Sequence, residues 1–267
     1  MPEVIYVYGL VRNDFDASRL PAGIDDSAVV ASSIGEFRAL LSRLPTPAYD
    51  ADAVARNAGD VAWISPRALA HDRVLTWAQE HGGVVPFPMF SLFSGEDALQ
   101  TQLMQRAAEL RHTFERVHNA DEFGVRAHRR DSAMLQVIDQ LDEGIGRLRA
   151  EAAVASPGQR YLLDRKITEQ SSAAIRGAAQ RIARDVFERL RPLAREAESR
   201  PLVPDRDRAP EVTLVLNGAF LVDRATTTAF RAAVAECMRE YEGHGISFEF
   251  TGPWPPYNFV ADRGAGA

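Results

Sequence analysis

Few side chains in this sequence could act as nucleophiles, acids, bases or metal ligands, and they are scattered. Cys237 is the single cysteine, so neither an intrachain disulfide nor a cysteine-based metal cluster is expected. Its neighbours at helical spacing are apolar: Phe230, Val234, Met238 and Tyr241. In such a setting a free cysteine is far more often a small core residue than a catalyst. We therefore expect Cys237 to lie in a hydrophobic core.

The histidines and aspartates show no pattern typical of a metal or catalytic site. The six histidines, none of which forms an obvious ligand pair, are His71, His81, His112, His118, His128 and His244. Two aspartate pairs have the spacing of metal-binding loops, Asp14 with Asp16 and Asp205 with Asp207. Neither pair has the glycine and distal glutamate of a calcium loop. Phosphate-binding loops, GxSxG and HExxH are also absent. We therefore predict no catalytic, cofactor-binding or metal-binding residues, which favours an interaction protein over an enzyme.

The most distinctive stretch is Gly252-Pro253-Trp254-Pro255-Pro256-Tyr257-Asn258-Phe259. Its three prolines remove backbone donors and favour an extended, stiff backbone, and no residue from Thr251 to Val260 is charged. A polyproline II repeat of ~3 residues would place Trp254 and Tyr257 on one face. Two interpretations remain open. The stretch is either a lid packed on the sheet of its own C-terminal domain, or a docking surface with the partner-binding residues Trp254, Tyr257 and Phe259.

The second half of the chain predicts a small sheet covered by long helices. We expect, in order, a strand at 123–128, helices at 131–153 and 159–198, a strand at 211–222, a helix at 226–241 and a strand at 245–251. The two long helices have apolar residues spaced three and four apart, and they are predicted to form an antiparallel hairpin. Parts of this order are typical of a split βαβ, ferredoxin-like layout.

The first half predicts a separate unit of strands and helices. We expect a buried strand at 4–11, an interrupted strand at 84–93, and helices at 66–81 and 96–117, with Ser65 as an N-cap. Residues 28–44 form either a hairpin or a strand followed by a short helix. The predicted fold is therefore α+β with two domains, residues 1–120 and 121–260, the second ferredoxin-like with a long helical hairpin. Residues 261–267 are predicted to be a disordered tail.

Composition and charge narrow the classes of function. The chain has 267 residues, 46% hydrophobic and 25% charged, which is ordinary for a globular protein of one or two domains. Its 31 basic and 37 acidic residues give a net charge of -6, which argues against nucleic-acid binding. No apolar stretch approaches the ~20 residues that span a bilayer, and the N-terminus lacks the pattern of a signal peptide. We therefore expect a cytoplasmic protein that binds neither nucleic acid nor membrane.

Several segments, taken in order along the chain, are distinctive together. The main ones are Tyr6-Val7-Tyr8-Gly9-Leu10-Val11, Val84-Val85-Pro86 with Phe93, Leu216-Asn217-Gly218-Ala219-Phe220-Leu221-Val222, and the stretch from Gly252 to Phe259. Weaker ones are Glu122-Phe123-Gly124-Val125 and Pro157-Gly158 with Tyr161-Leu162. This ordered set resembles the F/L family of gas vesicle accessory proteins (GvpF/GvpL). The family's middle motif is usually Pro-x-Arg-Phe-Gly-Thr. This chain departs from it, because Pro86 is followed by Phe87, Pro88, Met89, Phe90 and Ser91.

The resemblance implies a two-domain α+β protein that takes part in assembling gas vesicles, the gas-filled protein shells that give some cells buoyancy. It also implies contact with the small hydrophobic gas vesicle shell protein A and with other accessory proteins, and no enzymatic activity. Such a protein is located in the cytoplasm or is a minor structural component of the vesicle. One alternative stays open from the residues alone: a small-ligand-binding or enzymatic ferredoxin-like protein with a pocket near Cys237 or His128.

Overall fold

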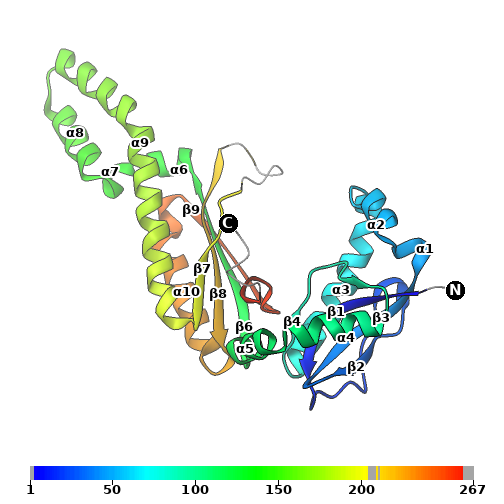
Figure 1. Cartoon of the computed structure of the whole chain (residues 1–267). Helices are drawn as coiled ribbons and strands as arrows, with labels where there is room; N and C mark the ends of the chain where they lie inside the picture. Colours follow the sequence, from blue (N-terminus) through cyan, green and yellow to red (C-terminus); the bar gives the residue numbers. More distant parts are fainter. Residues whose placement is uncertain (1–2, 204–208, 210, 261–267) are drawn as a thin grey trace. The chain divides into compact units, whose positions relative to one another are not determined.

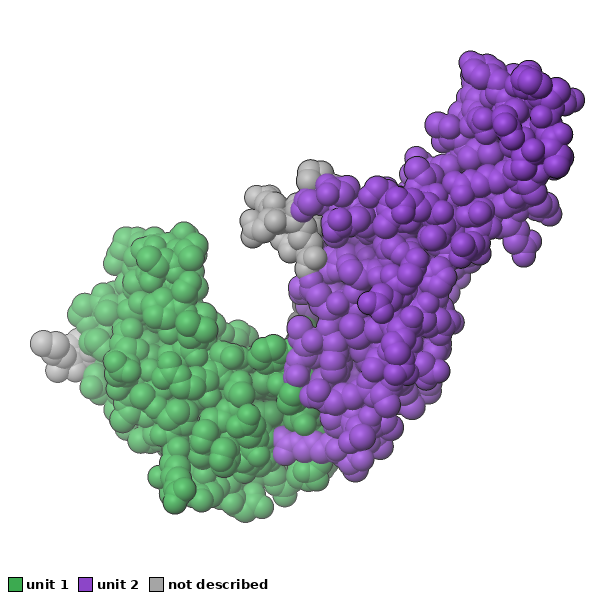
Figure 2. Space-filling model, turned by 180° about the vertical axis from the view of Figure 1, so that it is seen from behind, with its two compact units in different colours: residues 1–122, 253–267 green, residues 123–252 purple. Residues whose placement is uncertain are grey.

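The computed structural model describes residues 3–203, 209 and 211–260, and these form two compact units. Unit 1 contains residues 3–122 together with residues 253–260, and unit 2 is Phe123–Gly252 (Figure 2). The division falls close to the boundary predicted at residue 120. Residues 253–260, in contrast, group with the N-terminal unit and not with the C-terminal domain to which the sequence analysis assigned them. The tail predicted at 261–267 lies outside the described residues.

The sheet of unit 1 is built around its first strand. β1 (Glu3–Arg12) pairs with β3 (Phe37–Pro45), β4 (Val85–Pro86) and β5 (Leu92–Phe93), and β2 (Val30–Ile34) pairs with β3. All these pairings are antiparallel, and the strand order is β2-β3-β1-β4. β1 has neighbours on both edges, and its apolar run is buried on both faces.

The hairpin alternative for residues 28–44 is confirmed. β2 and β3 are joined by a two-residue turn in which Gly35 has φ +59°. Glycine adopts this left-handed conformation without steric cost. The interrupted strand predicted at 84–93 is present as β4 and β5, two short segments on the same edge of β1.

The helices of unit 1 depart from the predicted boundaries. They are α1 (Thr46–Tyr49), α2 (Ala51–Asn57), α3 (Val61–His81), α4 (Glu96–Gln105) and α5 (Ala107–Val117). The predicted cap at Ser65 is wrong, because the Asp60 side chain caps α3 five residues earlier by accepting from the Ala62 amide. Pro66 is tolerated inside α3 although it lacks an N–H. The helix predicted at 96–117 is divided at Arg106 into α4 and α5.

The sheet of unit 2 has the strand order β7-β8-β6-β9. Its strands are β6 (Ala120–Arg130), β7 (Glu196–Ser199), β8 (Val212–Asp223) and β9 (Ile246–Trp254). The sequence analysis missed β7, because it continued a helix through Glu198. β9 lies at the sheet edge, and there Pro253 is accepted within the strand because one side of an edge strand needs no donors.

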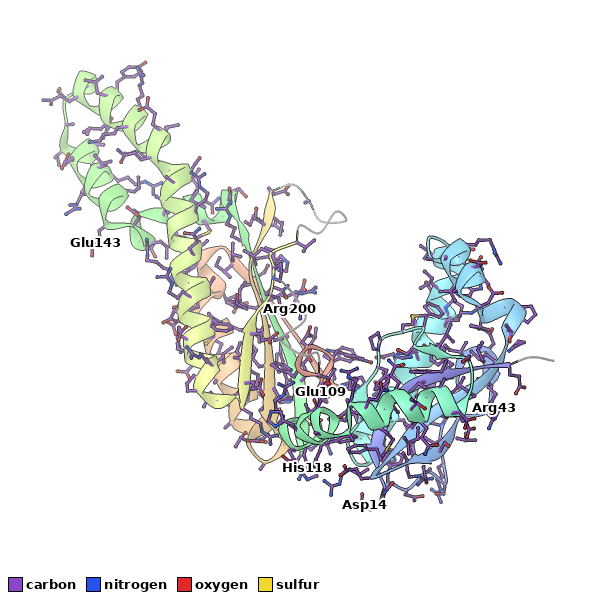
Figure 3. The ribbon with its side chains drawn as sticks, viewed as in Figure 1. Asp14, Arg43, Glu109, His118, Glu143 and Arg200 are labelled. Carbon is purple, nitrogen blue, oxygen red and sulfur yellow. The ribbon has the colours of Figure 1, made fainter. Side chains whose placement is uncertain are left out.

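The helices of unit 2 are α6 (Asp131–Gln136), α7 (Ile138–Leu141), α8 (Glu143–Val154), α9 (Pro157–Leu190) and α10 (Thr227–Tyr241). Of these, α9 and α10 cover one face of the sheet, whereas α7 and α8 lie beyond it (Figure 1). The single helix predicted at 131–153 is therefore three short ones, and Asp142 caps the last of them. Glu143, labelled in Figure 3, marks the start of α8. α8 and α9 form the expected antiparallel hairpin (Figure 1). The core of unit 2 lies between the sheet and α9 and α10, with Phe123, Phe220 and Phe230 fully buried.

Candidate functional site

The end of the aromatic-proline stretch is anchored on unit 1. We call residues 253–260 the strap. The Tyr257 hydroxyl donates to Oδ1 of Asp72 at 2.8 Å. The Asn258 amide donates to Oε2 of Glu122 at 2.8 Å, and the Asn258 side chain donates to the other carboxylate oxygen. Arg116 donates to the carbonyl of Phe259. The strap is thus held by four polar contacts from three different parts of unit 1.

The three aromatic residues proposed to bind a partner have different environments. Phe259 is 2% exposed and serves as a buried anchor, whereas Trp254 and Tyr257 are 39% and 36% exposed. The backbone is not extended throughout, because residues Tyr257–Phe259 form a short 3-10 turn. Burial, followed by the hydrogen bond to Asp72, raises the pKa of Tyr257, so its hydroxyl remains a donor at neutral pH.

A groove of about 590 Å³ lies beside Tyr257 on unit 1. One wall is the segment from Val85 to Phe93, and the others come from α4, α5 and the strap. The lining residues are Val85, Pro86, Phe87, Pro88, Phe90, Ser91, Leu92, Phe93, Gln102, Arg106, Glu109, Leu110, Thr113, Tyr257 and Val260. Most of these side chains are aromatic, aliphatic or proline. The polar members include Glu109 on α5 (Figure 3), whose carboxylate pairs with Arg106 at 2.9 Å.

The wall of the groove is fixed by hydrogen bonds to β1. The Phe87 amide donates to the Tyr8 carbonyl at 2.9 Å, and the Val7 amide donates to the Ser91 carbonyl at 2.9 Å. Between these points the Phe90 amide donates to the Tyr6 hydroxyl at 3.2 Å. Phe90 has φ +64°, a left-handed conformation that is unusual for a bulky residue. The wall therefore holds a strained backbone against β1.

The polar groups beneath the groove are neutral and fully engaged. The Tyr6 hydroxyl lies 2.7 Å from Nδ1 of His71. Burial lowers the pKa of His71 to about 4, and burial raises the pKa of Tyr6. Both rings are therefore uncharged at neutral pH, and the backbone carbonyl of Phe87 also interacts with His71. This pair supports the groove wall as a structural element.

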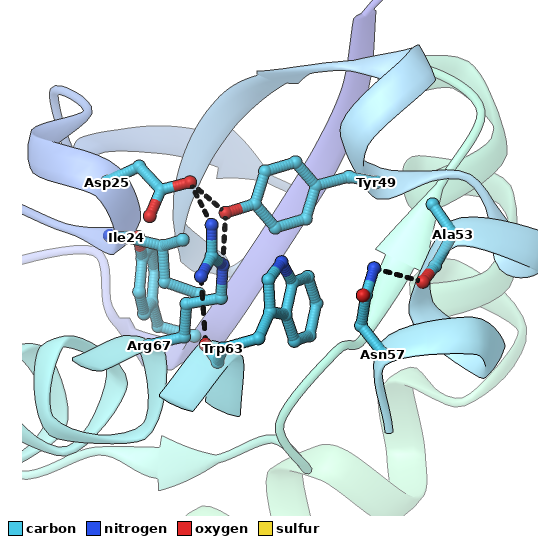
Figure 4. Close-up of polar contacts among 8 residues, drawn as sticks. Ile24, Asp25, Tyr49, Ala53, Asn57, Trp63 and Arg67 are labelled. Atoms are coloured by element: carbon cyan, nitrogen blue, oxygen red, sulfur yellow. Dashed lines mark hydrogen bonds and ion pairs between the residues drawn. The ribbon is translucent and has the colours of Figure 1, made fainter. Parts of the chain in front are cut away.

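A second cluster supports the wall from the side of α3 (Figure 4). Arg67 donates to Asp25 at 2.7 Å and to the Tyr49 hydroxyl at 2.8 Å, and its guanidinium lies 4.3 Å from the ring centre of Trp63. Trp63 in turn stacks on Phe90, with ring centres 5.3 Å apart. The cluster positions Trp63, and Trp63 positions the Phe90 ring in the groove wall.

Cys237 lies in the core of unit 2, as predicted. It is 1% exposed among the side chains between the sheet and α10, and burial raises the pKa of its thiol. His128 is also buried, at 3% exposed. Among the described residues, no cluster of three or more His, Cys, Asp or Glu side chains is arranged to hold a metal ion. In the same part of the chain, no helix has the length and apolar character needed to cross a bilayer.

Comparison with known proteins identifies the family. The family model described as gas vesicle synthesis protein GvpL/GvpF matches residues 4–261. The chain belongs to the GvpL/GvpF family. Gas vesicle protein L of a Streptomyces species is 26% identical, over 96% of this chain and 92% of the relative. Gas vesicle protein L2 of Halobacterium salinarum is 23% identical, over 96% and 91%. The resemblance found in the sequence is thereby confirmed.

Solved GvpF structures share the fold of this GvpL/GvpF chain. The crystal structure of GvpF from Anabaena sp. matches with a TM-score of 0.69 at 19% identity, covering 97% of each chain. The structure of GvpF from Microcystis aeruginosa also gives 0.69, at 16% identity, over 98% of this chain and all of the other. The mixed helix and sheet architecture is therefore common to these gas vesicle proteins.

Two of the four segments that carry the GvpL/GvpF resemblance supply lining residues of the groove, namely the wall from Val85 to Phe93 and the strap with Tyr257. A further one forms the buried strand β1, which does not line the groove but holds its wall by hydrogen bonds. All three segments stand out in the sequence, but their proximity was not predicted. Asp72 and Arg116 were missed, because isolated charged residues on helices carry no distinguishing pattern. Glu122 was noted only as part of a weak family match, with no role assigned to it.

Proposed function

We propose that this protein binds the small hydrophobic shell protein A of gas vesicles and assists vesicle assembly at nucleation or growth. The observation that carries the proposal is the groove of unit 1, which is lined by two family-resembling segments, the Val85 to Phe93 wall and the strap. A very hydrophobic shell subunit exposes apolar surface until it polymerises. An apolar groove that covers part of this surface would keep the subunit available for assembly.

The chemistry of the groove suits such a partner. The half-buried side chains of Phe87, Phe90 and Phe93 provide apolar surface, and Gln102 and Arg106 provide polar groups. Protein interfaces combine apolar and polar surface in this way. A volume of about 590 Å³ is within the range of pockets that accept several apolar side chains.

Within this proposal the aromatic residues of the strap have separate roles. Phe259 fastens the strap to unit 1, while the exposed parts of Trp254 and Tyr257 are available to a partner. A rigid, pre-ordered aromatic surface lowers the entropy cost of binding. The lid and docking interpretations of the stretch are therefore compatible, with unit 1 as the surface that the strap covers.

We further propose that unit 2 is a ferredoxin-like domain. Its strands follow the chain order β6, β7, β8, β9 and the sheet order β7-β8-β6-β9, with α9 after the first strand and α10 after the third. This arrangement supports a split βαβ layout. The expected partners also include other gas vesicle accessory proteins, and the expected locations are the cytoplasm and the vesicle. The alternative with a pocket near Cys237 loses support, because that thiol lies in a filled core.

The first prediction tests shell-protein binding through the groove. Phe87→Asp places a charge in the apolar lining, and we expect binding of shell protein A to weaken about tenfold or more. The measurement is biolayer interferometry with shell protein A fused to a soluble carrier, the carrier alone being the blank. Trp254→Ala provides a second variant at a partly exposed position and should also weaken binding.

Leu69→Asp is the matched control, because Leu69 is 67% exposed on α3 and does not line the groove. It should bind as the unsubstituted protein does. Thermal unfolding of every variant separates lost binding from lost structure. If the unsubstituted protein does not bind the fusion, the proposed function is wrong. If it binds and both groove variants bind equally well, the groove is not the binding site.

A further inference from the structure

The hairpin of α8 and α9 ends in an exposed apolar tip. We define the hairpin tip as residues 152–163. Val154 is 88% exposed, Tyr161 is 69% exposed and Leu162 is 64% exposed. The hairpin extends from the sheet of unit 2, as Figures 1 and 2 show, and the tip supplies no side chain to the described core cluster. Folding of unit 2 therefore does not explain why large apolar residues are retained there.

The tip is nevertheless well ordered by local contacts. Ser156 donates from its hydroxyl and its amide to Oε1 of Gln159, at 2.9 and 3.3 Å, which forms a capping box at the start of α9. Pro157 occupies the first turn, where its missing N–H costs nothing. Arg160 donates from Nε to the Ala152 carbonyl at 3.0 Å and so closes the end of α8. The exposed apolar residues are thus presented on a preformed support.

Gly158 leaves the start of α9 open. It lies in the first turn of the helix, and a Cβ atom added to it would meet no described atom within 4 Å. The backbone of the tip is therefore accessible to another molecule.

The charge around the tip selects the chemistry of that partner. Residues 152–159 contain no charged side chain, and the guanidinium of Arg160 is turned back onto the carbonyls of α8. The nearest charges outside the tip are Glu151 before it and Asp164 and Arg165 after it, and Arg165 pairs with Glu169 at 2.8 Å. An acidic partner or a nucleic acid would find no complementary charge on the tip. An uncharged apolar protein surface fits it.

The size of the tip argues against a stable dimer formed through it. Three partly exposed side chains can bury on the order of 400 Å², about half of what one partner contributes to a standard interface. Such a patch binds weakly alone. It becomes effective as a second contact, because a first contact elsewhere on the same chain raises the local concentration of the partner.

We propose that the hairpin tip is a second docking surface for the apolar, uncharged face of the hydrophobic shell subunit. One chain would then engage neighbouring subunits through the groove of unit 1 and through the tip. This inference rests on the proposed function, because it assigns a further surface to the same partner.

The second prediction tests the tip on a densely coated surface of carrier-fused shell protein A. Leu162→Glu should weaken apparent binding about tenfold, because an apolar contact is replaced by a charge that must be desolvated. The new glutamate precedes Lys166 by four residues, a spacing that favours the helix, so α9 should stay intact. Circular dichroism checks this point, and Leu69→Glu on α3 is the matched control.

The outcomes separate the two proposals. Absence of binding by the unsubstituted protein overturns the proposed function and, with it, the role of the tip. Binding that is unchanged by Leu162→Glu but weakened by Phe87→Asp overturns the tip proposal alone.

Analytical ultracentrifugation shows whether the tip binds a second copy of this chain instead of the shell subunit. If Leu162→Glu converts a dimer of this chain into a monomer, the occupant of the tip is a second copy and the proposal is wrong. A loss specific to Leu162→Glu in a monomeric protein supports it.

Discussion

Phe90 shows how one residue in the groove wall combines strain and support. Its left-handed φ of +64° costs about 1–2 kcal/mol for a residue that carries a Cβ. The ring stacks on Trp63 and meets the edge of the Tyr6 ring, with centres 5.3 and 6.3 Å away, and the amide donates to the Tyr6 hydroxyl. These contacts hold a conformation that phenylalanine alone would avoid.

The third prediction is that glycine at position 90 gives a more stable protein than alanine, the reverse of their usual order. Phe90→Ala and Phe90→Gly both remove the ring, but only glycine relaxes the left-handed backbone. We therefore expect Phe90→Gly to be more stable than Phe90→Ala by about 1 kcal/mol, although glycine normally lowers stability. Urea unfolding of both variants gives the difference in free energy. An alanine variant as stable as the glycine variant would show that the wall is not strained at this residue.

For single residues, the sequence predicted the core position of Cys237 but not the backbone conformation of Phe90. The core position of Cys237 was predictable, because the apolar spacing along α10 places it on the buried side of one helix. The conformation of Phe90 was not predictable. It depends on Tyr6, which is 84 residues away in the chain, and on Trp63 from α3. Local propensity disfavours the conformation that these distant contacts stabilise.

The strap is the element whose position departs most from expectation. It was predicted to be extended and to belong with the C-terminal domain. Its hydrogen bonds are instead made to Asp72, Arg116 and Glu122 of unit 1. Glu122 is 5% exposed, so its carboxylate needs donors in place of water, and both the amide and the side chain of Asn258 supply them.

The fourth prediction concerns this attachment. Asn258→Ala removes the side-chain donor to a buried carboxylate and should lower the free energy of unfolding by about 1–3 kcal/mol. The strap should also exchange its amide hydrogens faster, which hydrogen exchange with mass spectrometry measures. Asn13→Ala, which removes an exposed side-chain donor to the Gly35 carbonyl, is the control. Unchanged exchange in the strap of Asn258→Ala would show that Phe259 alone holds it.

Other elements could be predicted where the pattern that specifies them lies within a few neighbouring residues. The α8–α9 hairpin follows from apolar periodicity and turn residues, whereas the β2–β3 hairpin was one of two alternatives that the local signals left open. β7 was missed because Glu196–Ser199 is short and polar, and it becomes a strand only by pairing with β8. Strand formation at a sheet edge depends on the neighbour more than on the sequence of the strand.

Two separate cores define the whole molecule. The core cluster of unit 2 is drawn entirely from residues 123–250, whereas unit 1 also uses the strap at the far end of the chain. The two units should therefore differ when each is produced alone. Residues 123–252 include every residue of the described core cluster of unit 2. A fragment of residues 1–122, in contrast, lacks the buried anchor Phe259.

The fifth prediction follows from this difference. A fragment of residues 123–252 should unfold cooperatively, with a helical circular dichroism spectrum. A fragment of residues 1–122 should be less stable than unit 1 in the full chain. A peptide of residues 253–260 added in excess should raise its melting temperature, because a ligand of the folded state stabilises it. The same peptide carrying Asn258→Ala is the control. A fragment 1–122 that is insensitive to the peptide would show that the strap does not stabilise unit 1.

The sequence by itself determined the elements and the family, because helical periodicity, strand alternation, turns and short motifs are encoded within a few residues of one another. It also showed how few residues could do chemistry. Only the tertiary structure decided where those motifs meet. β1, the Val85 to Phe93 wall and the strap are far apart in the chain, and hydrogen bonds such as those from Phe90 to Tyr6 and from Asn258 to Glu122 fix the wall and the strap that line the groove. Such contacts depend on the packing of distant segments, which no local pattern specifies.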